Sequence, residues 1–220
     1  MEADAEGAEL PGEKIYNVED EQVLENHMMK DLTVPNRQGT VLETKRLTLR
    51  PMQAADIDAL LVIFTDLQVM AAFDEEPFNR EQMSRWLGRN LDHQDEYGYG
   101  LFSVILKANG LLIGDCGLEV MEVDGMQVAE LGYDFRSDYW NQGYATEAAS
   151  AVRDYAFDVL GLPQLISLVR VKNAASQRVA EKIGMERISE FSRYGNQYWK
   201  YGLVRVASGL DKSSQSHGNA

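Results

Sequence analysis

Residues 127–148 read QVAELGYDFRSDYWNQGYATEA, and this stretch predicts a strand, a short loop and the start of a helix. The strand is indicated by apolar side chains at every second position, Ala129, Leu131, Tyr133 and Phe135. Its other face is acidic, because it carries Glu130 and Asp134. Beyond the loop, apolar residues follow the 3.6-residue helical period as far as Gly161.

The loop between this strand and helix has the features of an anion-binding site. The first N–H groups of a helix lack intrahelical partners, and the helix dipole is positive at that end. Gly143 and Ala145 are small enough to let a phosphate approach the backbone. The loop is neither a Walker loop nor a three-glycine dinucleotide fingerprint, and an isolated loop of this kind is more often a simple tight turn.

Strand and helix patterns alternate along most of the chain, which predicts an α/β fold. The second junction of this kind is a strand over 164–171 followed by a helix that opens at Asn173 and ends at Gly184. The remaining predicted elements are strands over 46–50, 101–107 and 111–122, helices from near Asp56 and over 79–92, and a final hairpin turning at Gly195-Asn196.

Three stretches together resemble the GNAT superfamily of acyl-CoA-dependent N-acyltransferases, particularly its branch of ribosomal-protein N-terminal acetyltransferases. They are LETKRLTLRP at 42–51, the segment from Glu130 to Ala148, and the segment from Asn173 to Met185. The resemblance covers about residues 41–205 and implies one domain, with a mixed, mostly antiparallel central sheet, splayed middle strands and flanking helices. Trp140 stands where the broader superfamily has Gln or Arg, as in the ribosomal-protein branch.

The resemblance also implies a site for acetyl-CoA. The backbone N–H groups expected to hold its pyrophosphate are those of Gln142, Gly143, Tyr144, Ala145 and Thr146. The pantetheine arm is expected between strands 127–135 and 164–171, bonded to the open edge from Leu131 to Tyr133. Asn173 is expected to touch the pantetheine or fix the loop, and Ser176 to meet the thioester sulfur. Helix capping explains the same two residues equally well.

Attack of an amine on a thioester needs a lost ammonium proton, a stabilised oxyanion and a protonated leaving thiolate. We expect a backbone N–H near Tyr133 to meet the oxyanion, Glu130 to act as general base directly or through water, and Ser176 to serve the thiolate. The alternative for Glu130 is a solvated carboxylate or a partner of Arg136 or Arg170. Glu147, in the first turn of the helix, is expected to be structural.

Composition sets the domain organisation and the class of substrate. The 220-residue chain carries a formal charge of −14, and residues 1–40 hold ten acidic and three basic residues. We predict a disordered acidic extension over 1–40, a GNAT domain over 41–206 and a flexible tail over 207–220. A short docking helix over 16–29 is the alternative for part of the extension. The charge favours a cationic substrate over nucleic acid or a membrane surface.

The lone Cys116 and the absence of a long apolar run or a basic leader predict a cytoplasmic protein without disulfides. The three histidines have no metal-ligand spacing, so no metal site is expected. The leading hypothesis is an acetyl-CoA-dependent N-acetyltransferase acting on a protein N-terminus such as that of a ribosomal protein. A polyamine, an antibiotic or another small amine is the first alternative, and a non-catalytic CoA-binding module the second. The sequence leaves a homodimer open.

Overall fold

The computed structural model describes residues 32, 39–123, 125–193 and 195–205. The predicted tail over 207–220, the docking helix over 16–29 and nearly all of the predicted extension lie outside these residues. The strands are β1 (Leu42–Glu43), β2 (Leu47–Pro51), β3 (Leu101–Leu106), β4 (Leu111–Val123), β5 (Met126–Phe135), β6 (Gln164–Arg170), β7 (Glu186–Arg193) and β8 (Asn196–Val204). The helices are α2 (Ile57–Phe64), α3 (Leu67–Ala71), α4 (Arg80–Tyr97), α5 (Tyr144–Asp154) and α6 (Ala174–Lys182).

The strands form an eight-stranded sheet in the order β1-β2-β3-β4-β5-β6-β8-β7. Every neighbouring pair is antiparallel except β5 and β6, which are parallel. The predicted mixed, mostly antiparallel α/β sheet is therefore confirmed. Antiparallel neighbours follow directly from the short hairpins, whereas the parallel pair needs the crossover that α5 supplies.

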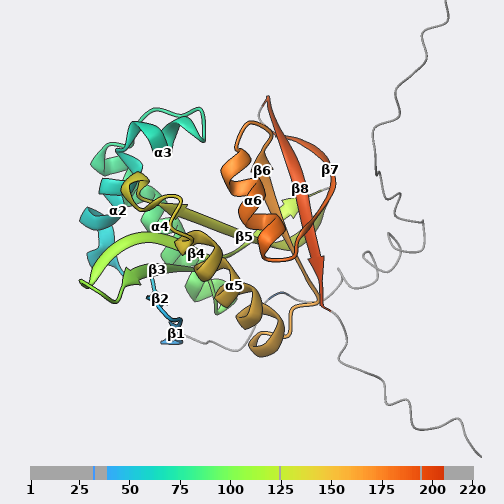
Figure 1. Ribbon diagram of the computed structural model, residues 1–220, viewed down its shortest axis with the longest axis horizontal. Coiled ribbons are helices and arrows are strands. Elements are labelled where there is room, and N and C mark those ends of the chain that lie inside the picture. The colour runs from blue at the N-terminus through green and yellow to red at the C-terminus, as the bar shows by residue number, and fades with distance from the viewer. Residues whose placement is uncertain (1–31, 33–38, 124, 194, 206–220) are drawn as a thin grey trace, which may run out of the picture. The chain divides into compact units, whose positions relative to one another are not determined.

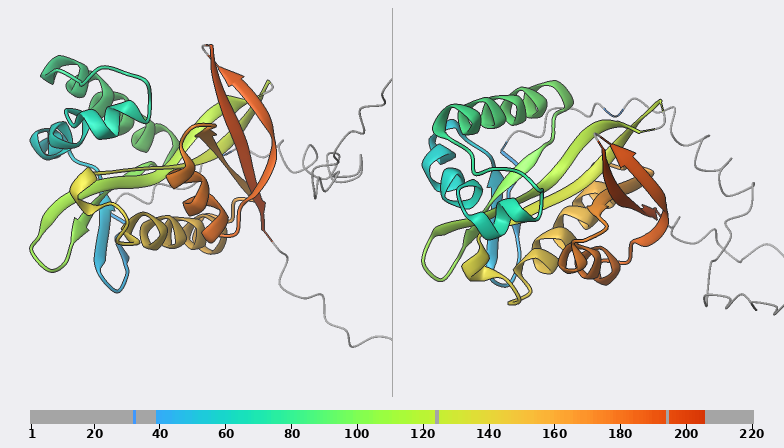
Figure 2. Two further views of the ribbon diagram at one scale, coloured as in Figure 1. Left: turned by 45° about the horizontal axis from the view of Figure 1, so that its top comes forward. Right: turned by 90° about the horizontal axis from the view of Figure 1, so that it is seen from above.

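The middle of the sheet is splayed, as expected. Strand β5 pairs with β4 along its whole length, from Phe135 opposite Gly114 to Met126 opposite Val123. In the described residues β5 pairs with β6 at one position only, Glu130 opposite Ile166. Figures 1 and 2 show β7 and β8 turned away from the direction of β4 and β5. The sheet therefore opens into a fork beyond Glu130.

Helices cover both faces of the sheet, and each face has its own apolar core. Figure 2 shows α2, α3 and α4 on one side and α5 and α6 on the other. Fully buried residues of the first core include Leu60, Ile63 and Met83. Leu131 and Val152 belong to the second core, in which α5 packs across β4 and β5. This packing holds the N-terminus of α5 beside the fork.

Several element boundaries differ from the prediction, for local physical reasons. Helix α4 runs on to Tyr97 instead of ending near residue 92, because its last turns are polar and the left-handed Gly98 is the residue that ends it. The short α3 was not predicted, since five residues are too few to show a period. The helix expected to continue to Gly161 changes from α5 to a π-helical segment over Tyr155–Val159. Among the described helices, none is both long enough and apolar enough to cross a bilayer.

A buried carboxylate ties β2 to the start of α2. Asp56, only 6% exposed, accepts hydrogen bonds from Arg50 at 2.6 Å, from the backbone N–H of Gln53 at 2.9 Å and from the Ser103 hydroxyl at 2.7 Å. Burial alone would raise the pKa of Asp56, but these hydrogen bonds outweigh it and lower the pKa. The network joins β2, β3 and α2.

Removing this carboxylate should destabilise the fold. Asp56→Ala leaves the Arg50 guanidinium and the buried Ser103 hydroxyl without their acceptor, which costs about 3 kcal/mol. Thermal denaturation should show a Tm lower by roughly 6–12 °C. The matched control is Asp58→Ala, whose exposed carboxylate pairs with Arg80 at the surface and should change Tm by about 2 °C or less. Equal losses in the two variants would contradict this assignment.

Candidate active site

The loop before α5 is held in a sharp turn by two left-handed residues. Asn141 has φ 59° and Gly143, the N-cap of α5, has φ 81°. No side chain caps this helix end, so its first N–H groups remain available to an external acceptor. Trp140 donates its indole N–H to the carbonyl of Phe135 at 2.8 Å, which anchors the loop to the end of β5.

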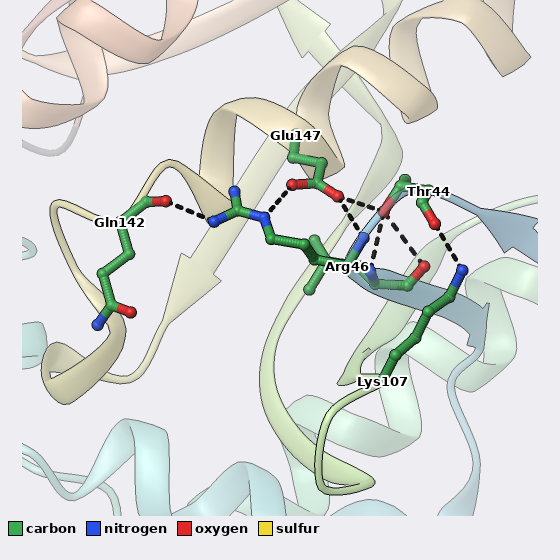
Figure 3. Close-up of polar contacts among 6 residues, drawn as sticks. Thr44, Arg46, Lys107, Gln142 and Glu147 are labelled. Atoms are coloured by element: carbon green, nitrogen blue, oxygen red, sulfur yellow. Dashed lines mark hydrogen bonds and ion pairs between the residues drawn. The ribbon is translucent and has the colours of Figure 1, made fainter.

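Arg46, in the turn between β1 and β2, supports this loop with its side chain (Figure 3). Its Nη1 donates to the carbonyl of Gln142 at 2.9 Å, and its guanidinium lies 4.2 Å from the centroid of the Tyr144 ring. A Cβ added at Gly143 would lie 3.5 Å from Arg46 Nη2. Arg46 therefore places a positive charge beside the N-terminus of α5.

Glu147 is structural, as expected, because its carboxylate is engaged by the β1–β2 turn (Figure 3). It accepts from the Thr44 hydroxyl at 2.6 Å, from the backbone N–H of Arg46 at 2.8 Å and from Arg46 Nε at 2.6 Å. Burial would raise its pKa, but these donors outweigh burial and lower it. The carboxylate thus fixes Arg46 against the first turn of α5.

The fork between β5 and β6 is bridged by Glu130. Its Oε1 accepts the backbone N–H of Leu168 at 3.0 Å, so this side chain reaches across from β5 to β6 just where the two strands part. The two cationic partners considered for Glu130 make other ion pairs, Arg136 with Asp138 and Arg170 with Asp74. Beyond this point Leu131, Gly132 and Tyr133 pair with β4 on one side only.

The other predicted site residues, Tyr133, Asn173 and Ser176, lie together at the other side of the fork. Asn173 caps α6, accepting the backbone N–H of Ser176 at 3.1 Å. The Tyr133 phenol donates to the Ser176 carbonyl at 2.9 Å, which joins β5 to α6, and burial raises the pKa of this phenol. The structure therefore brings Tyr133, Asn173 and Ser176 together, with the half-buried Ser176 in the first turn of α6.

A cavity of about 310 Å³ lies on the face of β4 and β5 that is covered by α2–α4. Its floor includes Asp115, Glu119, Gly132 and Asp134, which share one strand face. Its walls are mainly aromatic and apolar, formed by Phe64, Met70, Phe73, Phe78, Trp86 and Leu101. Because Gly132 and Tyr133 line it as well, the cavity opens directly beside the fork.

The carboxyl groups of the floor have raised pKa values. Burial, followed by the nearby Glu119 charge, raises the pKa of Asp134 to about 7. Burial also raises the pKa of Glu119, although the positive charge of Arg89 partly offsets it. The fully buried Asp115 has a pKa well above its ordinary value, first because of burial and then because of Asp134 and Glu119. Such values are typical of functional carboxylates.

Arg170 links β6 to the segment between α3 and α4. It comes from the end of β6, is only 9% exposed, and donates to the carbonyl of Phe73 and to the Asp74 carboxylate at 3.0 Å. Phe73, Glu75 and Phe78, in the segment between α3 and α4, line the cavity. The contact holds this segment against the end of β6.

Sequence reasoning missed four residues of this site: Arg46, Asp115, Glu119 and Arg170. Asp115 and Glu119 could have been found, because residues four apart in a strand share a face and both are acidic within a mostly apolar strand. The acidic face of residues 127–135 was the matching signal on β5. Arg170 gives no comparable signal, since its partners are 97 and 96 positions away in the chain.

Comparison with known proteins identifies the family. Residues 46–186 match the acetyltransferase (GNAT) domain. The chain belongs to the GNAT family. It is 32% identical to an uncharacterized N-acetyltransferase, YnaD, of Bacillus subtilis over 72% of this chain and 91% of that protein. The GNAT protein is therefore an N-acetyltransferase, and the family uses acetyl-CoA.

Solved structures share the same fold. An acetyltransferase from Agrobacterium tumefaciens superposes with a TM-score of 0.66 at 28% identity, over 80% of the GNAT chain and 99% of its own. A putative ribosomal-protein-serine acetyltransferase from Vibrio cholerae has a TM-score of 0.63 at 20% identity, over 76% and 99% of the two chains. The likeness at 20% identity shows the fold alone.

The raised pKa of Asp134 predicts a pH-dependent stability. Folded Asp134 keeps a proton that the unfolded chain releases near pH 4, so its contribution is fully present below about pH 4 and is lost as pH rises to about 7. Asp134→Asn removes this titration. Its Tm relative to wild type should rise by about 3 °C or more between pH 5 and pH 7.5.

Differential scanning calorimetry across this pH range measures the effect. The control is Asp92→Asn, an exposed carboxylate on α4 whose Tm difference from wild type should be independent of pH. A constant Tm difference for Asp134→Asn would contradict the raised pKa.

Proposed function

We propose that the protein transfers the acetyl group of acetyl-CoA directly to a primary amine within a ternary complex. The observation that carries this proposal is the fork, since β5 leaves β6 after a single residue pair beside the uncapped N-terminus of α5. An extended thioester fits between diverging strands, and a pyrophosphate fits a helix N-terminus. Among the fold relatives, aminoglycoside acetyltransferase AAC(6')-Ib was solved in complex with coenzyme A, at a TM-score of 0.62 and 17% identity.

In this proposal the loop and the edge of β5 hold the cosubstrate. The pyrophosphate accepts from the backbone N–H groups of Gln142, Gly143, Tyr144, Ala145 and Thr146, with the Arg46 charge beside them. The pantetheine pairs with the edge of β5 from Leu131 to Tyr133, which β6 leaves unpaired. Asn173 supports the same region by capping α6.

The proposed chemistry forms one C–N bond and breaks one C–S bond. The amine nitrogen attacks the thioester carbonyl, the Tyr133 backbone N–H stabilises the oxyanion, and the CoA thiolate leaves. Glu130 receives the ammonium proton through a water molecule, and the Leu168 N–H holds its carboxylate in place. As the C–S bond breaks, the nitrogen loses its second proton, which passes through the Ser176 hydroxyl to the leaving thiolate, so the products are an amide and CoA with the first proton on Glu130.

The acceptor proposed from the sequence was a protein N-terminus, and the cavity supports a small amine more directly. Its carboxylates lie beneath walls that are mainly aromatic and apolar. A relative at 25% identity, over 62% of this chain and 70% of its own, is the spermidine N(1)-acetyltransferase of Escherichia coli. A basic peptide N-terminus is the second candidate, because the exposed Glu75 at the cavity suits a cationic chain.

Blocking the loop should abolish cosubstrate binding. In Gly143→Trp the indole would occupy the space above the helix N-terminus, so the Kd of acetyl-CoA measured by calorimetry should rise at least about 100-fold. The matched control is Gly110→Trp, which also has a positive φ but sits in the β3–β4 turn, where a Cβ meets nothing within 4 Å. Unchanged binding in a folded Gly143→Trp would overturn the proposed placement.

Arg46 should affect acetyl-CoA more than the amine. Arg46→Met removes the hydrogen bond to Gln142 and the charge at the loop, so the KM for acetyl-CoA should rise about 10-fold while the KM for the amine stays nearly constant. Steady-state kinetics with mass-spectrometric product detection separates the two constants. Arg85→Met, an exposed arginine paired with Glu81 on α4, is the control and should change neither.

A further inference from the structure

The floor of the cavity contains a fully buried carboxylate with no hydrogen-bond partner. Both side-chain oxygens of Asp115 are buried, and neither has a partner among the residues that the structure describes. Asp115 lies directly opposite Asp134 in the β4–β5 ladder, and Glu119 lies four residues further along β4 on the same face, opposite Glu130. Two carboxyl groups therefore face each other at the floor of the cavity, and the exposed Glu119 lines the same cavity further along.

These carboxyl groups destabilise the folded protein when no ligand is present. An unpaired buried carboxylate loses its hydration without compensation, and like charges on neighbouring strands add to that cost. The raised pKa values of Asp115, Asp134 and Glu119 express the same strain. A cation entering the cavity would relieve it, because it supplies opposite charge to the facing Asp115 and Asp134.

The chemistry of the cavity favours an alkylammonium ion. An ammonium group carries three N–H donors, so it can donate to the facing carboxyl groups of Asp115 and Asp134 together. The described residues contain no group of three or more metal-ligating side chains close enough to hold a metal ion. The walls of Phe64, Phe73, Phe78 and Trp86 suit a methylene chain and the positive charge that it carries. The one cation on the wall, Arg89, is exposed and comes from the outer α4.

We propose that Asp115 and Asp134, with Glu119 adding negative charge further along the same face, form a second cation-binding subsite, which holds the distal ammonium group of a linear aliphatic diamine or polyamine while its other nitrogen is acetylated. The reacting nitrogen lies near Gly132 and Tyr133, which line the same cavity beside the fork. The inference rests on the proposed acetyl transfer and specifies its acceptor class. The subsite selects acceptors with two nitrogens separated by an apolar linker.

The test compares acceptors that differ by one nitrogen. With acetyl-CoA and wild-type protein, kcat/KM for 1,4-diaminobutane should exceed that for 1-aminobutane at least 10-fold, because only the diamine fills the subsite. Asp115→Asn keeps the shape of the side chain and should reduce this ratio below about 3, with the KM for acetyl-CoA unchanged. Asp92→Asn, on the exposed side of α4, is the charge-matched control and should keep the wild-type ratio.

A second measurement keeps the inference testable apart from catalysis. Calorimetric titration of the protein with 1,4-diaminobutane, without acetyl-CoA, should show binding that Asp115→Asn and Glu119→Gln each weaken at least 5-fold. If diamine binds in this way but no amine is acetylated, the subsite stands and the proposed function fails. Equal kcat/KM for the diamine and the monoamine, a preference for basic peptides over both, or diamine binding unaffected by these substitutions would overturn the subsite.

Discussion

Strands β5 and β6 run side by side at a single residue pair, Glu130 with Ile166, and the Glu130 carboxylate spans the gap to the N–H of Leu168. Continued pairing would use up the edge of β5 and close the space between the two strands. The divergence instead leaves backbone donors and acceptors of Leu131–Tyr133 unpaired on one side, which a strand edge can tolerate only with water or an extended ligand as partner. Helices pack on both faces of the sheet, α5 and α6 on one face and α2–α4 on the other, and this packing keeps β5 and β6 apart.

Positive and negative charge lie on different faces of the sheet at this fork. At the loop, the N-terminus of α5 and Arg46 present positive charge, and Glu147 holds Arg46 in position from behind. On the opposite face, Asp115, Glu119 and Asp134 make the acceptor cavity acidic. An anionic cosubstrate and a cationic acceptor are therefore drawn to different faces of β5 and meet at Gly132 and Tyr133.

The sequence predicted features that depend on neighbours along the chain, and it missed those that depend on the fold. The adjacent strands predicted over 101–107 and 111–122, the Asn173 cap and the strand–loop–helix at 127–148 are local, and each appears as expected. The sequence also predicted a structural role for Glu147, because a carboxylate is favoured in the first turn of a helix. The link from Arg46 to Gln142 and the link from Arg170 to Phe73 join segments about a hundred residues apart. The pairing of Asp115 with Asp134 needed the β4–β5 register, which no local pattern in the sequence specifies.

A crystal structure of the protein with coenzyme A tests the central claim most directly. The account predicts diphosphate oxygens about 3 Å from the backbone nitrogens of Gln142–Thr146, and the pantetheine hydrogen-bonded to β5 from Leu131 to Tyr133 with its thiol inside the fork. A diphosphate bound elsewhere, or β6 paired with β5 through Tyr133 and no ligand between them, would contradict it.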